Sequence, residues 1–309
     1  MALIVRALRT GDSHDAEAFA RVRRAALPFM LATADSVAFD LAQAHPEAHF
    51  QMLVAEADGE IIGTAQTGLA YDSPEPGQAF ANVYVDPERQ GRGAGSLILR
   101  TAEERLAALG ATTVYSWVLD APAHRAFAEK RGYRSSRSAH FLRLDLVNGP
   151  LPPLPEVPAG VELRTGEDFA DDPRPLFDLD AETMADEPSD IGVEFVDYAH
   201  WLTHTWRHPL FDRALTTVAV WDGRPVAFTL ARGDGGARYG SVMTGTARDH
   251  RGLGLAKLAK AASLHRARAA GRTEAFTGND TGNGPMLAIN RWFSYEVGAT
   301  EVRYVRELG

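Results

Sequence analysis

The chain contains no cysteine. This absence excludes disulfide bonds, zinc sites with cysteine ligands, and catalysis by a cysteine nucleophile. A covalent intermediate, if the chain forms one, would have to be carried by serine, threonine or lysine.

Long hydrophobic runs are also missing. No apolar stretch approaches the roughly 20 residues that a helix needs to cross a bilayer. Residues 1–12 carry Arg6 and Arg9 within an alternating apolar pattern, which predicts a strand and not a secretory signal peptide. We therefore expect a cytoplasmic protein with no membrane partner.

Positive charge is scarce, because 32 Lys and Arg residues stand against 41 Asp and Glu, for a net charge of −9. Proteins that bind nucleic acids usually carry a basic surface, so we expect no nucleic-acid partner. Hydrophobic residues make up 45% of the 309 residues. This composition and length predict a globular chain of one large or two ordinary domains.

Proline is concentrated in one stretch, VNGPLPPLPEVPAG at 147–160. Proline fixes φ and lacks an N–H donor, so neither a helix nor a central strand is expected there. We predict an N-terminal domain over 1–146, a linker over 147–160 and a C-terminal domain over 161–309.

The two halves repeat one pattern. RTGD at 9–12 has a counterpart in RTGE at 164–167, and the Asp-Gly pairs at 58–59 and 222–223 each separate two alternating apolar runs. Such pairs predict tight hairpins, because the turn requires positive φ. Helices are expected over 16–27, 37–44, 175–184 and 195–206. Each half therefore predicts the order β-α-α-β-β-β-α-β-α-β.

A glycine-rich loop joins a strand to a helix in each half, QGRGAG at 90–95 and RGLGLA at 251–256. The first N–H groups of a helix and the positive end of its dipole attract anions. Small residues let a diphosphate approach the backbone closely. Arg92, Arg251 and Lys257 could add positive charge.

Besides an anion site, two other interpretations of these loops are open. One is a turn without a ligand, although two copies in equivalent places weigh against it. The other is a dinucleotide loop, G-x-G-x-x-G. Gly91, Gly93 and Ser96 nearly fit that pattern, but the last glycine is missing and the loop does not follow the first strand.

Segments 83–95 and 246–256 resemble the acetyl-CoA motif of the GNAT superfamily, [QR]-x-x-G-x-[GA] after a strand. The motif falls on Gln90, Gly93 and Gly95, and again on Arg251, Gly254 and Ala256. The resemblance covers nearly the whole chain twice, as in tandem GNAT enzymes. It implies an α/β chain of two tandem GNAT folds, each a mixed, mostly antiparallel sheet flanked by helices.

The resemblance also implies acetyl-CoA as the cosubstrate. Its pantetheine arm would lie between the fourth and fifth strands of a half. The N–H at Val85 or Thr246 would face the thioester oxygen, which makes Thr246 a candidate catalytic residue. Gly245, inside the strand of Thr246, suggests a bulge or a close backbone approach there. The candidate cofactor-binding residues are Val83, Val85, Gln90, Gly91, Arg92, Gly93, Ala94, Gly95 and Ser96 in the first half, and Thr244, Thr246, Arg251, Gly252, Leu253, Gly254, Leu255, Ala256, Lys257, Asn279 and Asn283 in the second.

The sequence departs from the family where a general acid and base are expected. The position of the usual tyrosine acid holds Ala128 in the first half and Asn290 in the second. Neither half has a glutamate at the usual base position on the fourth strand, near which Asn82 lies. The resemblance therefore assigns neither role, and Asn290 is a second catalytic candidate.

The second half is favoured for catalysis. In this family an asparagine after the fifth strand often contacts the cofactor, and Asn279 and Asn283 are placed there, although both also suit a turn or an N-cap. Residues 119–124 of the first half contain no asparagine. In tandem GNAT enzymes the C-terminal domain is generally the catalytic one. The first half would bind cofactor or give structural support.

Two further clusters have ordinary explanations. Asp186, Glu187, Asp190 and Glu194 could bind an ammonium group, but a solvated helix edge accounts for them more simply. His200, His204 and His208 recur at helical spacing without a further ligand nearby, so we expect no metal site.

The sequence thus predicts an N-acetyltransferase that moves acetyl from acetyl-CoA directly to a primary amine of a small molecule. We expect a monomer or a homodimer. One alternative is a non-catalytic CoA-binding regulatory or sensing protein, which would release no thiol with any amine. Another is a nicotinamide-dependent oxidoreductase, which would bind NADH.

Overall fold

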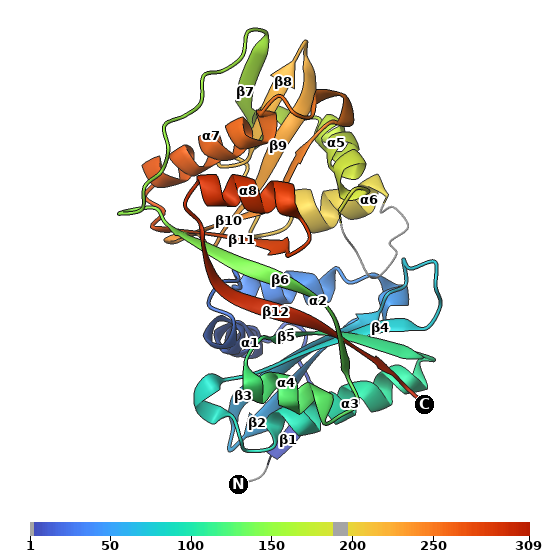
Figure 1. The fold of residues 1–309 in the computed structure, drawn as a ribbon. Coiled ribbons are helices and arrows are strands. Elements are labelled where there is room, and N and C mark those ends of the chain that lie inside the picture. The colour runs from blue at the N-terminus through green and yellow to red at the C-terminus, as the bar shows by residue number, and fades with distance from the viewer. Residues whose placement is uncertain (1–2, 188–196) are drawn as a thin grey trace. The chain divides into compact units, whose positions relative to one another are not determined.

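The computed structural model describes residues 3–187 and 197–309, which form two compact units (Figure 1). Of these residues, unit 1 contains 3–139 and 299–309, and unit 2 contains 140–187 and 197–298. The element order β-α-α-β-β-β-α-β-α-β occurs twice along the chain, as predicted.

Unit 1 is a sheet in the order β1-β2-β3-β4-β5-β12-β6. Its neighbours are antiparallel from β1 to β4 and between β5 and β12, whereas β4 and β5 are parallel. The elements are β1 (Leu3–Ala7), α1 (Ser13–Ala26), α2 (Ala34–Ala42), β2 (Gln51–Ala57), β3 (Glu60–Leu69), β4 (Gln78–Val85), α3 (Ala94–Ala108), β5 (Thr113–Leu119), α4 (Pro122–Glu129), β6 (Arg134–Asp145) and β12 (Glu296–Glu307).

Unit 2 repeats the arrangement with the order β6-β11-β10-β9-β8-β7, in which β10 and β11 are the parallel pair. A π-helical turn at Leu202–Trp206 follows α6 directly. The elements are β7 (Val161–Thr165), α5 (Arg174–Met184), α6 (Tyr198–Trp201), β8 (Thr217–Trp221), β9 (Arg224–Gly233), β10 (Arg238–Thr246), α7 (Leu255–Ala269), β11 (Glu274–Asp280) and α8 (Gly284–Trp292). Short 3-10 turns lie at Pro46–Ala48, Pro87–Arg89, Gly166–Phe169 and Arg248–His250.

The long strands β6 and β12 each contribute to both units. The chain leaves unit 1 within β6 at His140 and returns within β12 at Ala299. The proline-rich segment 147–160 belongs to unit 2, where Arg268 donates hydrogen bonds to the carbonyls of Leu146 and Gly149. The contacts therefore divide the chain at His140 and Ala299 and not at the ends of the expected linker. The domain boundaries expected from the sequence stay a prediction.

Both hairpins turn where the sequence predicts. Asp58 and Gly59 have φ of 51° and 84°, and Asp222 and Gly223 have φ of 50° and 76°. Two successive positive φ angles give the turn the twist of the strands that it joins.

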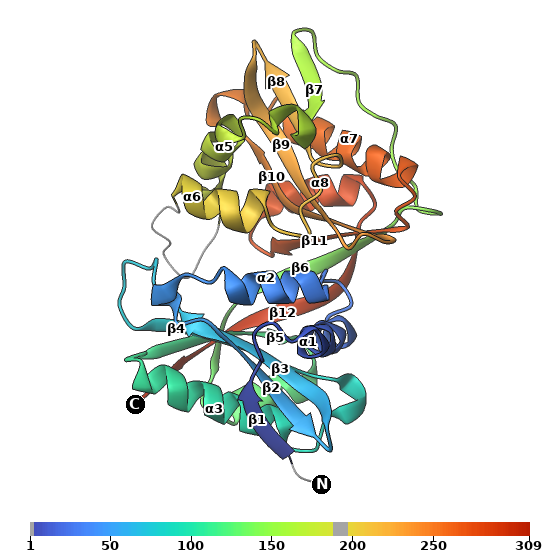
Figure 2. The ribbon, with the colours of Figure 1, turned by 180° about the vertical axis from the view of Figure 1, so that it is seen from behind.

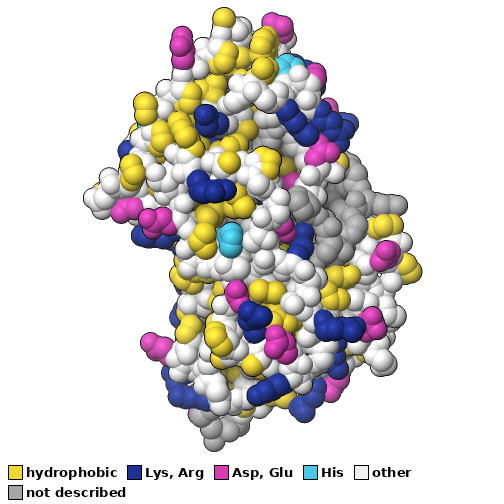
Figure 3. Space-filling model, viewed as in Figure 1, with side chains coloured by type: hydrophobic (Ala, Val, Ile, Leu, Met, Phe, Trp, Pro, Cys, Tyr) yellow, Lys and Arg dark blue, Asp and Glu magenta, His cyan; other side chains and the backbone are white. Residues whose placement is uncertain are grey.

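Helices cover both faces of each sheet (Figure 2). In unit 1, Phe19 of α1 packs with Met52 and Val54 on one face, while Ile98 of α3 packs with Ala65 and other residues of the opposite face. In unit 2, α5 and α6 pack on one face and α7 and α8 on the other. On the surface in Figure 3, acidic and basic side chains are interspersed. Within the described residues, none of the helices has the length and apolarity to span a bilayer.

Gly245 in β10 gives α5 room to approach the sheet. A Cβ at this position would lie 2.7 Å from Oγ1 and Cγ2 of Thr183, which is a side chain of α5. The bulge of β10 against β9 falls elsewhere, between Ser241 and Met243. The atoms that approach Gly245 belong to the Thr183 side chain, so the expected close backbone approach stays a prediction.

The variant Gly245→Ala should therefore lose about 1–3 kcal/mol of unfolding free energy, because the added methyl group overlaps Thr183 in a packed interior. Urea unfolding would measure the loss. In the double variant with Thr183→Ala, Oγ1 and Cγ2 are removed while Cβ of residue 183 stays 2.8 Å from the added methyl group, so the overlap is relieved in part and the two losses should not add fully. Gly284→Ala is the matched control, because no atom lies within 4 Å of its Cβ position. A Gly245→Ala protein as stable as this control would contradict the packing account.

Candidate active site

The β4–α3 loop exposes backbone amides at the start of a helix. Gly91 and Gly93 have φ of 77° and 90°, in the region that glycine adopts without strain. No side chain caps α3, so the first N–H groups of the helix remain available to a ligand. A Cβ at Gly91 would meet no atom within 4 Å, which leaves the loop open to close approach.

The parallel strands β4 and β5 separate just beside this loop. They pair only from Gln78 to Phe80 with Thr113 to Tyr115. Beyond that point the side chain of Asn82 bridges them, and its Oδ1 accepts a hydrogen bond from the N–H of Trp117 at 2.9 Å. A gap in the hydrogen bonding of the sheet follows.

The backbone of β4 presents alternate residues to this gap. Asp86 donates its N–H to the carbonyl of Ile62 in β3 at 2.9 Å. Because alternate residues of an antiparallel pair bond to the same neighbour, Tyr84 also points its N–H to β3. The N–H and carbonyl groups of Val83 and Val85 therefore face the gap, where an extended amide chain could pair with them.

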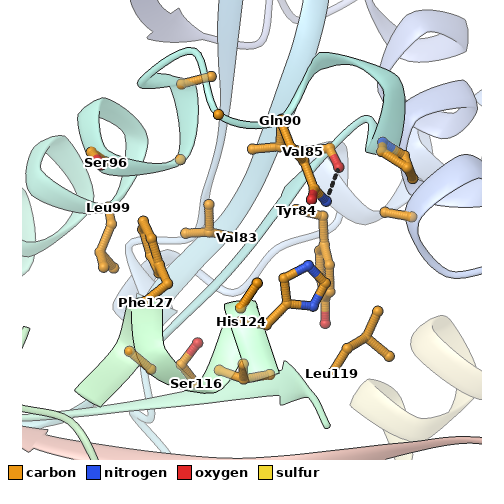
Figure 4. A pocket seen from close by; sticks show the side chains of 18 of the residues that line it. Val83, Tyr84, Val85, Gln90, Ser96, Leu99, Ser116, Leu119, His124 and Phe127 are labelled. Carbon is orange, nitrogen blue, oxygen red and sulfur yellow. Dashed lines mark hydrogen bonds between the residues drawn. The ribbon is translucent and has the colours of Figure 1, made fainter. Parts of the chain in front are cut away.

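A cavity of about 660 Å³ occupies the gap and reaches the loop (Figure 4). Every first-half residue predicted to bind cofactor lines it, except Arg92. The lining residues that were missed look like ordinary core or helix-surface positions in the sequence, and they include Tyr84, Leu99, Ser116, His124, Phe127 and Tyr133. For Tyr84 the sequence does contain a signal. Side chains alternate along a strand, so Tyr84 lies between Val83 and Val85 and points to the opposite face of β4.

The side chain of Arg131 contacts two residues that line the cavity near the loop. Arg131 donates from Nη2 to the hydroxyl of Ser96 at 2.6 Å, and its guanidinium lies 3.6 Å from the ring centroid of Phe127. The side chain of the loop residue Gln90 donates a hydrogen bond from Nε2 to the carbonyl of Val85 at 3.5 Å. Amides, a helix N-terminus and a fixed arginine together suit an anionic group such as a diphosphate.

The second half has the same loop and strand geometry. Gly252 and Gly254 have φ of 80° and 77°, and α7 also starts without a side-chain cap. The strands β10 and β11 pair only from Arg238 to Gly240 with Glu274 to Phe276 before they separate. Further along, Gly132 and Ser294 share positive φ, of 82° and 64°. Counting from these landmarks, Leu99, Ala128 and Val118 of the first half correspond to Lys260, Asn290 and Asn279 of the second.

These three positions hold a buried hydrogen-bonded chain in unit 2. Lys260 donates to Oδ1 of Asn290 at 2.6 Å, and Asn290 donates to Oδ1 of Asn279. Lys260 and Asn290 are 0% and 1% exposed. Side chains that line the cavity in unit 1 thus have polar, mutually bonded counterparts in unit 2. Burial lowers the pKa of Lys260 to about 7.

The arginine of the second loop binds a carboxylate of its own unit. Asp186 accepts hydrogen bonds from Arg251 at 2.5 Å and from Arg248 at 2.8 Å. These two bonds hold the pKa of Asp186 well below its ordinary value. Glu182 accepts a hydrogen bond from the N–H of Arg248 at 2.6 Å. Of the acidic cluster noted in the sequence, Asp190 and Glu194 lie outside the described residues.

The other second-half candidates have local partners. The side chain of Asn283 caps α8 by accepting the N–H of Met286 at 3.3 Å, which confirms the N-cap interpretation. Thr244 bonds Thr229 through their hydroxyl groups at 3.1 Å, and Lys257 lies 4.5 Å from the ring centroid of Trp292. The carbonyl of Thr246 accepts a bond from Arg251 at 3.3 Å.

His200 lies in α6, His204 in the π-helical turn and His208 after it, and the three are not arranged around a cation. The rings of His200 and His204 lie 4.1 Å apart, and Nδ1 of His208 accepts the N–H of Leu210 at 3.2 Å. In residues 3–187 and 197–309, no three His, Asp or Glu side chains converge as metal ligands.

Known proteins resemble the chain in both sequence and fold. The model of the Acetyltransferase (GNAT) family matches residues 18–133. The mycothiol acetyltransferase of Nocardia farcinica (strain IFM 10152) is 34% identical over 223 residues, which make up 71% of this chain and 70% of the relative. The chain belongs to the GNAT family of acetyltransferases. This membership favours an enzyme over the non-catalytic alternative.

A second relative covers more of the sequence, and a solved structure shares the fold over nearly all of it. The mycothiol acetyltransferase of Thermomonospora curvata is 29% identical over 252 residues, 82% of this chain and 81% of the relative. The GCN5-related N-acetyltransferase from Sphaerobacter thermophilus shares the fold with a TM-score of 0.72 at 22% identity, over 99% of this chain and 95% of that one.

A tandem GNAT protein from the clavulanic acid biosynthesis pathway also has a TM-score of 0.72 at 22% identity, over 100% and 99% of the two chains. The structural matches confirm the α/β tandem GNAT fold, and the relatives named mycothiol acetyltransferases confirm the resemblance to enzymes of the GNAT family.

The buried lysine predicts a pH-dependent stability. Between about pH 7 and its ordinary value of 10.5, Lys260 binds a proton in the unfolded chain but not in the folded one, so stability falls as the pH falls through this window. The variant Lys260→Met removes that loss. Calorimetry should show that the melting temperature of the variant, relative to wild type, is higher near pH 7 than near pH 10.

The matched control is Lys257→Met, a partly exposed lysine on the same helix. It should change the melting temperature equally at both pH values. A Lys260→Met difference that does not depend on pH would show that the amine is hydrated in the folded protein.

Proposed function

We propose that this chain transfers an acetyl group from acetyl-CoA to a primary amine of a small molecule, and that the cavity of unit 1 is the site of transfer. The observation that supports this most is the continuity of that cavity. It joins an uncapped helix N-terminus with the free edge of β4. These are the two features that a molecule with a diphosphate and a long amide-containing arm requires.

The residues present fit acetyl-CoA in the following way. The amides after Gly91 and Gly93 would hold the diphosphate, with the guanidinium of Arg131 beside them. The groups of Val83 and Val85 that face the gap would pair with the amides of the arm. Leu99 and Phe127 supply apolar wall. The N–H of Val85 would stabilise the charge that develops on the thioester oxygen.

The transfer itself needs a neutral amine. Its nitrogen attacks the thioester carbonyl carbon, the C–N bond forms, and the C–S bond breaks to release CoA. The relatives named mycothiol acetyltransferases support a small-molecule acceptor. The absence of cysteine supports direct transfer, because no thiol of the protein can carry the acetyl group.

Two observations favour the first half over the second, which the sequence favoured. The arginine of the second loop binds Asp186, and the positions around the second gap hold the Lys260–Asn290–Asn279 chain. Thr246 and Asn290 stay predictions as catalytic residues. The cytoplasmic location and the oligomeric state, a monomer or a homodimer, also stay predictions.

The proposed reaction is tested by following free thiol as it is released from acetyl-CoA. A colorimetric thiol reagent has no background from the protein, because the chain has no cysteine. A panel of primary amines should include amino sugars, free amino acids and linear polyamines. We expect at least one amine to give saturable thiol release together with an acetylated product seen by mass spectrometry. Binding of acetyl-CoA without turnover on the whole panel would contradict the proposal.

The location of the site is tested with matched loop variants. Gly93→Glu and Gly254→Glu each place a bulky anion on a loop glycine with positive φ, so their backbone strain is comparable. In a calorimeter we expect wild type to bind about one equivalent of acetyl-CoA. Gly93→Glu should abolish binding, whereas Gly254→Glu should retain it. The reverse outcome would move the site to the second half, and two equivalents would make both loops functional.

A further inference from the structure

A buried carboxyl group lies behind the wall of the cavity. Tyr84 lines the cavity from β4, and its hydroxyl donates a hydrogen bond to Oε1 of Glu301 at 3.2 Å. Glu301 comes from β12, where it is paired in register with Leu119 of β5, another residue of the wall. Glu301 is 7% exposed and Tyr84 is 8% exposed. Figure 4 shows the phenol of Tyr84 near His124 and Leu119.

This pair lies on the sheet face opposite to α3. Val83 and Val85 pack with the α3 side of unit 1, so the strand alternation turns Tyr84 to the face of α1. In agreement, Arg23 of α1 lies 5.2 Å from the ring centroid of Tyr84. The proposed acetyl-CoA arm follows the backbone of β4 through the gap, so Tyr84 is placed where an acceptor would approach from the other face.

The surroundings of Glu301 include groups that oppose its ionisation and groups that favour it. Burial raises its pKa to about 7, while the hydrogen bond from Tyr84 and the charges of Arg23 and Arg303 act in the opposite direction. Arg303 lies on the same strand, 5.2 Å from the ring centroid of Trp117. Burial and the nearby carboxylate raise the pKa of Tyr84 far above its ordinary value, so this phenol keeps its proton.

We propose that Glu301 accepts the proton of the incoming amine, with the hydroxyl of Tyr84 as the link between them. The inference rests on the proposed function in unit 1. It supplies a base where the resemblance to the family gives none, because the fourth strand has no glutamate at the usual position.

The step balances as follows. The amine nitrogen attacks the thioester carbon and gives up one proton to the oxygen of Tyr84, while Tyr84 passes its own proton to Oε1 of Glu301. The C–N bond forms and the C–S bond breaks. The thiolate of CoA leaves and takes up a proton from water, and the carboxyl of Glu301 returns its proton to solvent.

The test compares Glu301→Gln with Glu307→Gln in the thiol-release assay, using an amine that wild type accepts. Glutamine keeps the shape and the oxygen that binds Tyr84 but cannot take a proton. Glu307 is the control, because it lies on the same strand with a side chain that is 79% exposed. We expect kcat/KM to fall about 100-fold or more in Glu301→Gln, the range typical of a lost general base, and to be unchanged in Glu307→Gln.

The pH profile distinguishes a proton acceptor from a structural residue. In wild type, kcat/KM should rise through about pH 7 as Glu301 loses its proton, and this rise should be absent in Glu301→Gln. The rise from deprotonation of the amine lies at higher pH and should remain in both. Tyr84→Phe should lower kcat/KM without changing the dissociation constant of acetyl-CoA.

Two kinetic results would overturn the inference while leaving the proposed function intact. One is a Glu301→Gln enzyme with wild-type kcat/KM and profile. The other is loss of the rise near pH 7 in His124→Gln instead, which would make the imidazole in the cavity wall the base. A titration of ¹³C-labelled glutamate by NMR needs no amine, and Glu301 should titrate near pH 7. Titration at the ordinary value would equally reject the assignment.

Discussion

The pairing of β12 with β5 is the interaction on which the site depends. Seven residues of β12, Glu301–Glu307, pair with all of β5. Because β5 has a full-length partner on this edge, its other edge can leave β4 after three residue pairs without exposing both sides of the strand. The gap, the cavity and the placement of Glu301 beside Tyr84 all follow from this pairing.

The two halves show how one backbone can carry two different interiors. Glycines with positive φ recur at the same places, such as Gly93 and Gly254, and both helices behind them start without a cap. Among the differences are three corresponding side chains of each half. Apolar residues in the first half leave a cavity, whereas Lys260, Asn290 and Asn279 bond to one another in the second.

Much of this architecture could be predicted from the sequence, because the signals are local. The Asp-Gly hairpins, the glycine loops and the element order each depend on residues close together in the chain. The partner of β5 could not be predicted, since a strand at 296–307 reads the same whichever sheet it joins. Glu301 therefore looked like a residue of the second half. The bond between Asn279 and Asn290 was missed for a related reason, since Asn279 alone suits a cap or a cofactor contact and Asn290 alone suits the position of the usual acid.

The crossing of β6 and β12 has a consequence for how the protein is made. During synthesis, β5 emerges long before residues 299–309, and until then one of its edges has no partner. An unpaired edge invites association with other chains. The first half thus lacks one of its strands while the second is being translated, and a chain cut between residues 147 and 160 would leave the first half without residues 299–309.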